Sequence, residues 1–296
     1  MSSASSAAEP PLTTHGILRW AAGSAVFELT SPDPAVLDRA RVIFEPWLDG
    51  SASHPPRARF LVEADPGGTG ARWRVVRDGC EAATAETLDL ALAAVEYGAV
   101  ADMLNPDSGI VALHAALLSR HGRGVLLVGP KEAGKSTLAC ALWCAGWRLH
   151  SDDSAVIEDG RRARGIPRRV SLRAASRQLL GDEMWERVCR LPATSRTAAG
   201  LRFHPAAAPG DALADVGIAA VLFLARRGSA AGPGKLEPLD AGSALLALGP
   251  YCHRPEPGIG GAIQALQPLA DRVPMFDLGR GELAAMVARV EEAIAT

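Results

Sequence analysis

The stretch Gly124-Val-Leu-Leu-Val-Gly129-Pro-Lys-Glu-Ala-Gly134-Lys135-Ser136-Thr137 decides the fold of this chain. It begins with an apolar run typical of a buried strand, passes through a loop bounded by two glycines, and leads into a helix. The spacing fits the phosphate-binding loop, G-x-x-x-x-G-K-[ST], in the strand-to-helix context that the motif requires. The stretch therefore predicts a nucleotide-binding α/β fold.

Each residue type that the motif specifies has a physical role in binding phosphate. The two glycines can adopt backbone angles that other residues avoid, so successive N–H groups can face one anion, and the helix adds its positive end. Lys135 is expected to reach the β- and γ-phosphates of ATP, and the Ser136 hydroxyl to bind Mg²⁺. We expect these residues to contact the nucleotide: Gly129, Lys131, Ala133, Gly134, Lys135, Ser136 and Thr137. The alternative is a glycine turn with a surface lysine. Only three of the 31 basic residues are lysines, so a lysine at the motif position indicates a need for its compact point charge.

Composition sets the class of protein. The 296 residues are 48% hydrophobic and 22% charged, as in soluble globular proteins. The net charge of −2 gives no basic field for nucleic acid or an anionic membrane. No apolar run approaches the roughly 18 residues of a spanning helix. The five cysteines form no paired framework, and the first residues do not resemble a signal peptide, so we expect a cytoplasmic protein.

Patterning predicts two domains. Residues 1–106 form a small α+β domain after a flexible tail at 1–14, with the boundary in the turn-rich segment 105–109. Its predicted strands and helices lie at 17–29, 35–48 (helix), 57–63, 71–77 and 84–104 (helix). Residues 107–296 form the nucleotide-binding domain. It starts with a hairpin of strands at 110–119 and 124–129, followed by a helix at 135–145, a strand at 147–158, a helix at 174–190 and a long connection at 191–214 interpreted as a lid.

Asp152 and Asp153 follow a hydrophobic strand one helix beyond the loop. Proteins with this loop place a carboxylate there to hold Mg²⁺. A second carboxylate can take the proton from an attacking hydroxyl, and each raises the pKa of the other. The alternative is a solvated pair that caps the strand end. His114, on the strand before the loop, is either a core histidine or a site residue on this pattern.

His114-Ala-Ala-Leu-Leu, the glycine loop and Trp147-Arg-Leu-His-Ser-Asp152-Asp153 together resemble the catalytic domain of HPr kinase/phosphorylase. They are more similar still to the shorter HPr-kinase-like kinases of peptide biosynthesis clusters. The resemblance covers residues 110–158 well, and 165–173 and 219–227 loosely. It implies an α/β kinase fold related to phosphoenolpyruvate carboxykinase, which uses ATP and Mg²⁺ to phosphorylate a serine hydroxyl.

The resemblance also implies residue roles. His114 becomes an active-site residue, one aspartate the base and the other a neighbour of Mg²⁺. We assign Asp152 as the base and Asp153, with Ser136, to the metal. Segment 164–173 departs from the family because it is basic and lacks the expected acidic residue, so the resemblance leaves open whether HPr is a substrate and whether the reverse phosphorylase reaction exists. Arg173 and Arg226 are the arginines selected as candidates to neutralise a phosphoryl group.

The predicted function is an ATP-dependent kinase acting on a serine-type hydroxyl of a peptide or small protein. Two alternatives remain open: a small-metabolite kinase with the same site, and a nucleotide-binding module that transfers no phosphate. Nucleic acid and membrane are not expected partners. HPr kinases assemble, so a homo-oligomer is also compatible with the resemblance.

Overall fold

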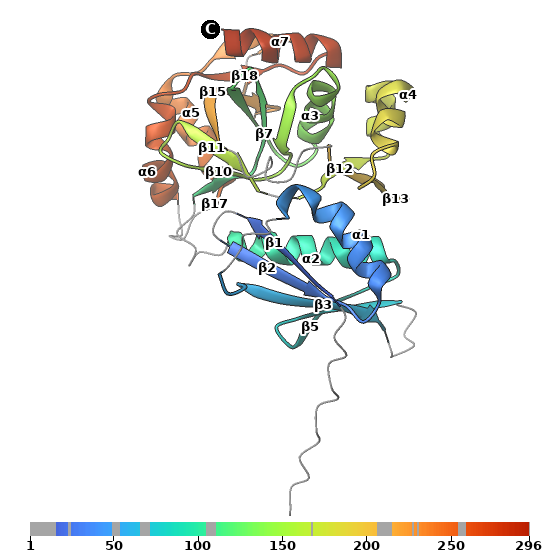
Figure 1. The fold of residues 1–296 in the computed structure, drawn as a ribbon. Coiled ribbons are helices and arrows are strands. Elements are labelled where there is room, and N and C mark those ends of the chain that lie inside the picture. The colour runs from blue at the N-terminus through green and yellow to red at the C-terminus, as the bar shows by residue number, and fades with distance from the viewer. Residues whose placement is uncertain are drawn as a thin grey trace, which may run out of the picture.

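The computed structural model describes residues 16–22, 25–48, 54–65, 72–104, 111–166, 168–205, 215–226, 228–229, 231–253 and 259–295. Within these ranges the chain forms three sheets, of five, ten and three strands, accompanied by seven α-helices. The five-stranded sheet and the first two helices lie on one side of the molecule, and the ten-stranded sheet and the remaining helices lie on the other (Figure 1). The fold is therefore mixed α/β.

The five-stranded sheet has the order β1-β2-β3-β4-β5, and all neighbours are antiparallel except β2 and β3. Its strands are β1 (Ile17–Ala22), β2 (Ala25–Thr30), β3 (Ala58–Ala64), β4 (Trp73–Arg77) and β5 (Cys80–Ala85). The predicted strand at 17–29 is in fact two, because Ala22 pairs with Ala25 and the chain reverses direction. The predicted hairpin of β3 and β4 is confirmed, whereas β5 was not predicted.

Two helices cover this sheet. Helix α1 (Pro34–Phe44) has a proline in its first turn and Asp33 as N-cap, and a short 3-10 helix, Glu45–Trp47, follows it. Helix α2 (Leu88–Met103) is capped by the Thr87 side chain. Aromatic rings fill the core between helix and sheet, with Trp20 stacked on Phe44 at a centroid distance of 4.4 Å.

The ten-stranded sheet has the order β17-β6-β10-β11-β15-β8-β7-β9, with β18 beside β15 and β16 beside β18. Its strands are β6 (Ala112–Leu113), β7 (Ala115–Arg120), β8 (Arg123–Val128), β9 (Arg148–Ser151), β10 (Ala155–Ile157), β11 (Arg162–Gly165), β15 (Val216–Leu224), β16 (Leu236–Pro238), β17 (Cys252–His253) and β18 (Met275–Leu278). Strand β15 is parallel to both β8 and β18. The antiparallel hairpin of β7 and β8 that leads into the loop is confirmed.

Helices cover both faces of this sheet because side chains alternate along its central strands. On β8, Leu127 belongs to the core beneath α3 (Lys135–Cys144), α4 (Ser176–Cys189) and α7 (Leu283–Ala295). Its neighbour Leu126 belongs to the core beneath α5 (Ala241–Leu248) and α6 (Ile259–Ala270). No helix in the described ranges is both long and apolar enough to cross a membrane.

The sequence prediction differs from the structure in two places that affect the site. The predicted strand at 147–158 is broken into β9 and β10, with Asp152 and Asp153 in the irregular backbone between them. The predicted connection at 191–214 contains two strands, β13 (Ser195–Thr197) and β14 (Gly200–Phe203), and residues 206–214 lie outside the described ranges. With β12 (Val170–Arg173) these strands form the third sheet, in the order β12-β14-β13.

Ion pairs connect the two larger parts of the molecule. Arg169 donates three hydrogen bonds to the Glu96 carboxylate of α2, from its backbone N–H (3.0 Å), Nε (2.9 Å) and Nη2 (2.7 Å). Their side chains are 0% and 2% exposed. Arg39 of α1 bonds to Asp89 and also to the carbonyl oxygens of residues 192 and 194. The domain boundary near residue 106 stays a prediction, because residues 105–110 lie outside the described ranges.

We predict that Glu96→Ala lowers the free energy of unfolding by about 3–5 kcal/mol, because it leaves the buried Arg169 charge without a partner. Chemical denaturation measures this change. The control is Asp38→Ala, which removes an exposed pair with Arg41 and leaves the unfolding midpoint where it is. Equal, small effects of both substitutions would contradict the coupling role of Glu96.

Candidate functional site

The loop after β8 is constrained at its glycines and by left-handed backbone angles. A Cβ at residue 129 would lie 2.6 Å from the carbonyl oxygen of Leu224 on β15, so only glycine fits there without a shift. Glu132 and Gly134 adopt left-handed angles, with φ of 71° and 98°. Helix α3 begins directly after Gly134, so the unpaired amides of its first turn face the end of the loop. The geometry fits an anion at this position.

A cavity of about 580 Å³ opens beside the loop. Of the seven residues predicted to contact the nucleotide, six line this cavity, between Lys131 and Thr137. The seventh, Gly129, is not in the lining and packs against β15. The cavity lining consists of Tyr97, His114, Lys131, Glu132, Ala133, Gly134, Lys135, Ser136, Thr137, Asp153, Arg168, Ser171, Arg173, Ala175, Ser176 and Leu179.

The Lys135 ammonium is folded back onto the loop. Its Nζ donates to the carbonyl oxygens of Gly129 (2.6 Å) and Pro130 (3.3 Å). Burial lowers the pKa of Lys135, and the nearby Asp153 and Asp152 carboxylates act in the opposite direction. A compact cation is thus held within the loop, where a bound phosphate would compete for it.

Asp152 is buried against the start of α3. Its Oδ2 accepts hydrogen bonds from the Ser136 hydroxyl (3.0 Å) and the Ser171 backbone N–H (3.2 Å). Burial raises the pKa of Asp152 to about 6, although Arg168 and both hydrogen bonds favour the charged form. Its Oδ1 is buried without a hydrogen-bond partner. A carboxylate oxygen that lacks a partner beside a hydroxyl is the oxygen-rich donor set that suits Mg²⁺.

The described residues contain no cluster of three or more histidine, cysteine or acidic side chains that could hold a metal by themselves. Mg²⁺ commonly binds through one or two protein oxygens together with water and substrate phosphates. Ser136 and Asp152 are the residues that would hold the ion.

Asp153 turns the other way and lines the cavity. Its Oδ1 lies 3.2 Å from Nδ1 of His114, and its Oδ2 accepts a 2.5 Å hydrogen bond from Nη1 of Arg168. Burial lowers the pKa of His114, and Asp153 opposes this shift. A neutral His114 can donate from Nδ1 and fix the carboxylate. His114 and Asp153 therefore contact each other at the cavity beside the loop.

This arrangement favours the reverse of the predicted division of roles. We assigned Asp152 as the base and Asp153 to the metal. The structure places Asp152 against Ser136 and outside the cavity lining, and Asp153 inside it. The physical reason is the break between β9 and β10, which sends two adjacent side chains in different directions.

The predicted arginines separate as well. Arg173 stands at the cavity rim, where it pairs with Glu132 at 2.7 Å. Arg226 does not belong to the cavity lining, because the buried Asp277 carboxylate binds its guanidinium through both oxygens. Arg168, which the prediction did not select, lines the cavity instead. Tyr97 of α2 was missed altogether, and nothing in the sequence distinguishes it from other residues of a helix.

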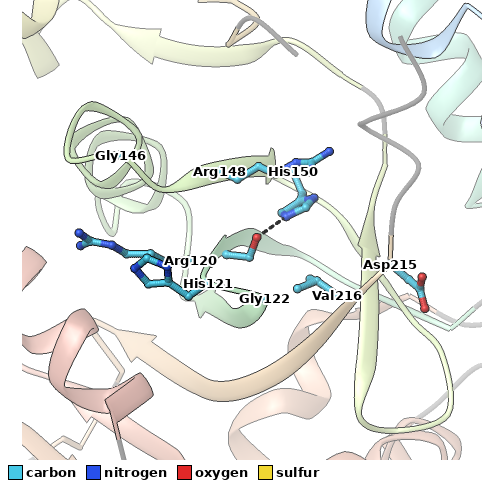
Figure 2. Close-up of a pocket in the computed structure, with 9 residues that line it drawn as sticks. Arg120, His121, Gly122, Gly146, Arg148, His150, Asp215 and Val216 are labelled. Atoms are coloured by element: carbon cyan, nitrogen blue, oxygen red, sulfur yellow. Dashed lines mark hydrogen bonds between the residues drawn. The ribbon is translucent and has the colours of Figure 1, made fainter. Parts of the chain in front are cut away.

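A second cavity, of about 470 Å³, lies at the other end of β7 and β9. Figure 2 shows its buried centre, where Ser119 and His150 form a 2.8 Å hydrogen bond, with Arg120 and His121 directed away from them. Arg120 pairs with Glu291, and Asp215 pairs with Arg162. The charged side chains of Arg120 and Asp215 at its rim are thus paired with other residues.

Comparison with known proteins gives limited similarities. A family model described as SynChlorMet cassette protein ScmC matches residues 85–167, which include α2, the loop and both aspartates. Among solved structures, the HPr(Ser) kinase/phosphatase from Coxiella burnetii is similar, with 14% sequence identity and a TM-score of 0.30. That alignment covers 61% of this chain and 90% of the other. None of the curated proteins searched matches the chain. Because a TM-score this low supports no argument about function, the functional argument rests on the geometry of the site.

We predict that Asp152→Asn stabilises the protein at pH 8, measured by urea unfolding without divalent cations. Because the pKa of Asp152 is raised in the folded state, its charged carboxylate destabilises the fold above about pH 6. This destabilisation decreases as the pH falls, and it is absent near the ordinary carboxyl pKa of about 4. The expected gain is about 3 kcal/mol at pH 8 and none at pH 4.

The matched control is Asp153→Asn, which removes a carboxylate paired with Arg168 and gives no gain at pH 8. If Asp152→Asn were no more stable than the unmodified chain at high pH, the carboxylate of Asp152 would not be held as a buried charge.

Proposed function

We propose that this chain is an ATP-dependent kinase that transfers the γ-phosphate to a serine-type hydroxyl on a peptide or small protein. The observation that carries the proposal is the division of the aspartate pair around one cavity. Asp152 is bound to Ser136 of the phosphate-binding loop, and Asp153 faces the cavity that this loop lines. A nucleotide-binding module that only senses ATP has no need for the second carboxylate.

The loop binds the substrate triphosphate through the amides of residues 133–137 and the Lys135 ammonium. Phosphate oxygens replace the two carbonyl oxygens that Lys135 contacts in the structure. Ser136 and Asp152 would hold Mg²⁺, which when bound would supply neutralising charge at the phosphates. Asp152 thereby loses the penalty of a buried carboxylate with an unsatisfied oxygen.

Asp153 is the proposed base. As the acceptor oxygen forms its bond to the γ-phosphorus, its proton passes to a carboxylate oxygen of Asp153, and the bond from the γ-phosphorus to the β–γ bridging oxygen breaks. The products are the phosphorylated acceptor and ADP, and the proton leaves Asp153 to solvent. His114 and Arg168 hold the carboxylate from two sides, so that it meets the acceptor in one orientation.

Two substitutions separate binding from transfer. We predict that Lys135→Ala weakens Mg·ATP binding at least about tenfold, because it removes the cation from the loop. Asp153→Asn keeps the affinity for Mg·ATP and lowers phosphoryl transfer by about 10²–10⁴-fold, the usual contribution of a general base. Calorimetry measures the first quantity and transfer of labelled phosphate the second. Lys235→Ala, a lysine outside the cavity lining, is the control for removing a positive charge.

The acceptor is identified by mass spectrometry for an added phosphate on peptides encoded beside this gene. Phosphate on a serine of such a peptide supports the proposal. Phosphorylation of a free hydroxylated metabolite alone would replace it with the small-metabolite kinase. Tight Mg·ATP binding with no transfer to any acceptor would leave only a nucleotide-binding module.

A further inference from the structure

Helix α2 belongs to the five-stranded sheet, yet one of its residues reaches the cavity of the other part of the molecule. Tyr97 lines the cavity and is 44% exposed. The proposed function assigns it no role, and its exposure shows that it is not a core residue. Its neighbours in space explain why it is there.

Two arginines contact this tyrosine. The Arg168 guanidinium carbon lies 4.4 Å from the Tyr97 ring centroid, and that of Arg202 lies 5.2 Å away. Both are cation–π distances. Each arginine also donates from Nη2 to the Tyr97 hydroxyl, at 3.1 Å for Arg168 and 3.3 Å for Arg202. The Tyr97 ring therefore contacts the Arg168 guanidinium, and the Tyr97 hydroxyl accepts a hydrogen bond from it.

The other edge of that guanidinium contacts the proposed base. Nη1 of Arg168 donates to Oδ2 of Asp153 at 2.5 Å, and the Arg168 side chain is only 17% exposed. Tyr97, Arg168 and Asp153 thus form a continuous chain of contacts. A planar guanidinium transmits orientation along such a chain better than a flexible ammonium would.

The position of Tyr97 is itself fixed by Glu96, the preceding residue of the helix. Glu96 binds Arg169, the residue after Arg168, through the buried ion pair described above. Two consecutive residues of α2 therefore meet two consecutive residues before β12. The helix cannot slide past the site without exposing or breaking a fully buried pair.

From these contacts we infer that Tyr97 is a positioning residue, which holds Arg168 against Asp153 and so makes the N-terminal α/β part a component of the phosphoryl-transfer site. The inference rests on the proposed function for the role of Asp153, but the contact that it assigns to Arg168 is a separate, measurable property. Tyr97 acts through Arg168 and is not assigned a contact with either substrate.

Three variants on one helix test the inference. Tyr97→Ala removes ring and hydroxyl, and Tyr97→Phe keeps the ring. Leu90→Ala is the matched control, since Leu90 is also exposed and lies seven residues earlier on the same helix face. We expect Tyr97→Ala to lower kcat about tenfold and Tyr97→Phe about threefold, with KM for ATP unchanged, because one oriented contact is worth about that much. Leu90→Ala leaves kcat and KM unchanged.

The second measurement does not depend on activity. The ¹⁵Nε–Hε resonance of Arg168, assigned by its loss in Arg168→Lys, reports whether the guanidinium is held. We expect a sharp, slowly exchanging signal in the unmodified chain and in Leu90→Ala, and a broadened or fast-exchanging signal in Tyr97→Ala.

The outcomes separate the two proposals. If the unmodified chain transfers no phosphate while Arg168 is released in Tyr97→Ala, the kinase function fails and the contact stands, so that Tyr97 positions Arg168 for another purpose. If Tyr97→Ala keeps a held Arg168 and an unchanged kcat, the positioning role is wrong. A raised KM for the acceptor with unchanged kcat and a held Arg168 would also overturn it, because Tyr97 would then bind the acceptor directly.

Discussion

The buried Asp152 carboxylate is the interaction on which the arrangement of the site depends. It follows β9, accepts a hydrogen bond from the first turn of α3 through Ser136, and accepts another from β12 through the Ser171 backbone. Three segments that are separate in the sequence therefore meet at the Asp152 carboxylate. A buried charge with one unsatisfied oxygen is costly, so its presence requires compensation. The Mg²⁺ of the proposed function would provide that compensation at the loop.

The same logic explains how the two larger parts of the molecule are joined. The buried pair of Glu96 and Arg169 places a helix of the five-stranded sheet against the segment that enters β12. The segment that carries Arg169 also carries Arg168, and through it Asp153. Two adjacent arginines thus connect the parts and the site: Arg169 binds Glu96 of the N-terminal part, and Arg168 binds Asp153 at the cavity. The small N-terminal part thus contributes Tyr97 to the cavity lining, although no chemical motif occurs in its sequence.

Local spacing made the core of this picture predictable from the sequence. The strand, glycine loop and helix are read from neighbouring residues, and the hairpin of β7 and β8 follows from two apolar runs and a short turn. The remainder depends on contacts between residues far apart in the chain. Arg226 is engaged by Asp277, 51 residues away, and Tyr97 reaches Arg168 across 71 residues. The opposite directions of Asp152 and Asp153 depend on a backbone break that the apolar pattern of 147–158 conceals. Strands β13 and β14 arise in a segment rich in proline, alanine and glycine. There β14 pairs with β12, and β13 pairs with β14, and this pairing overrides weak local preference.

The most direct test of the central claim is a crystal structure of this chain with Mg²⁺ and a non-hydrolysable ATP analogue. The account predicts the triphosphate in the loop of residues 129–137, the metal bound to Ser136 and Asp152, and the Asp153 carboxylate facing the γ-phosphate. A nucleotide bound elsewhere, or a γ-phosphate from which Asp153 points away, would contradict it.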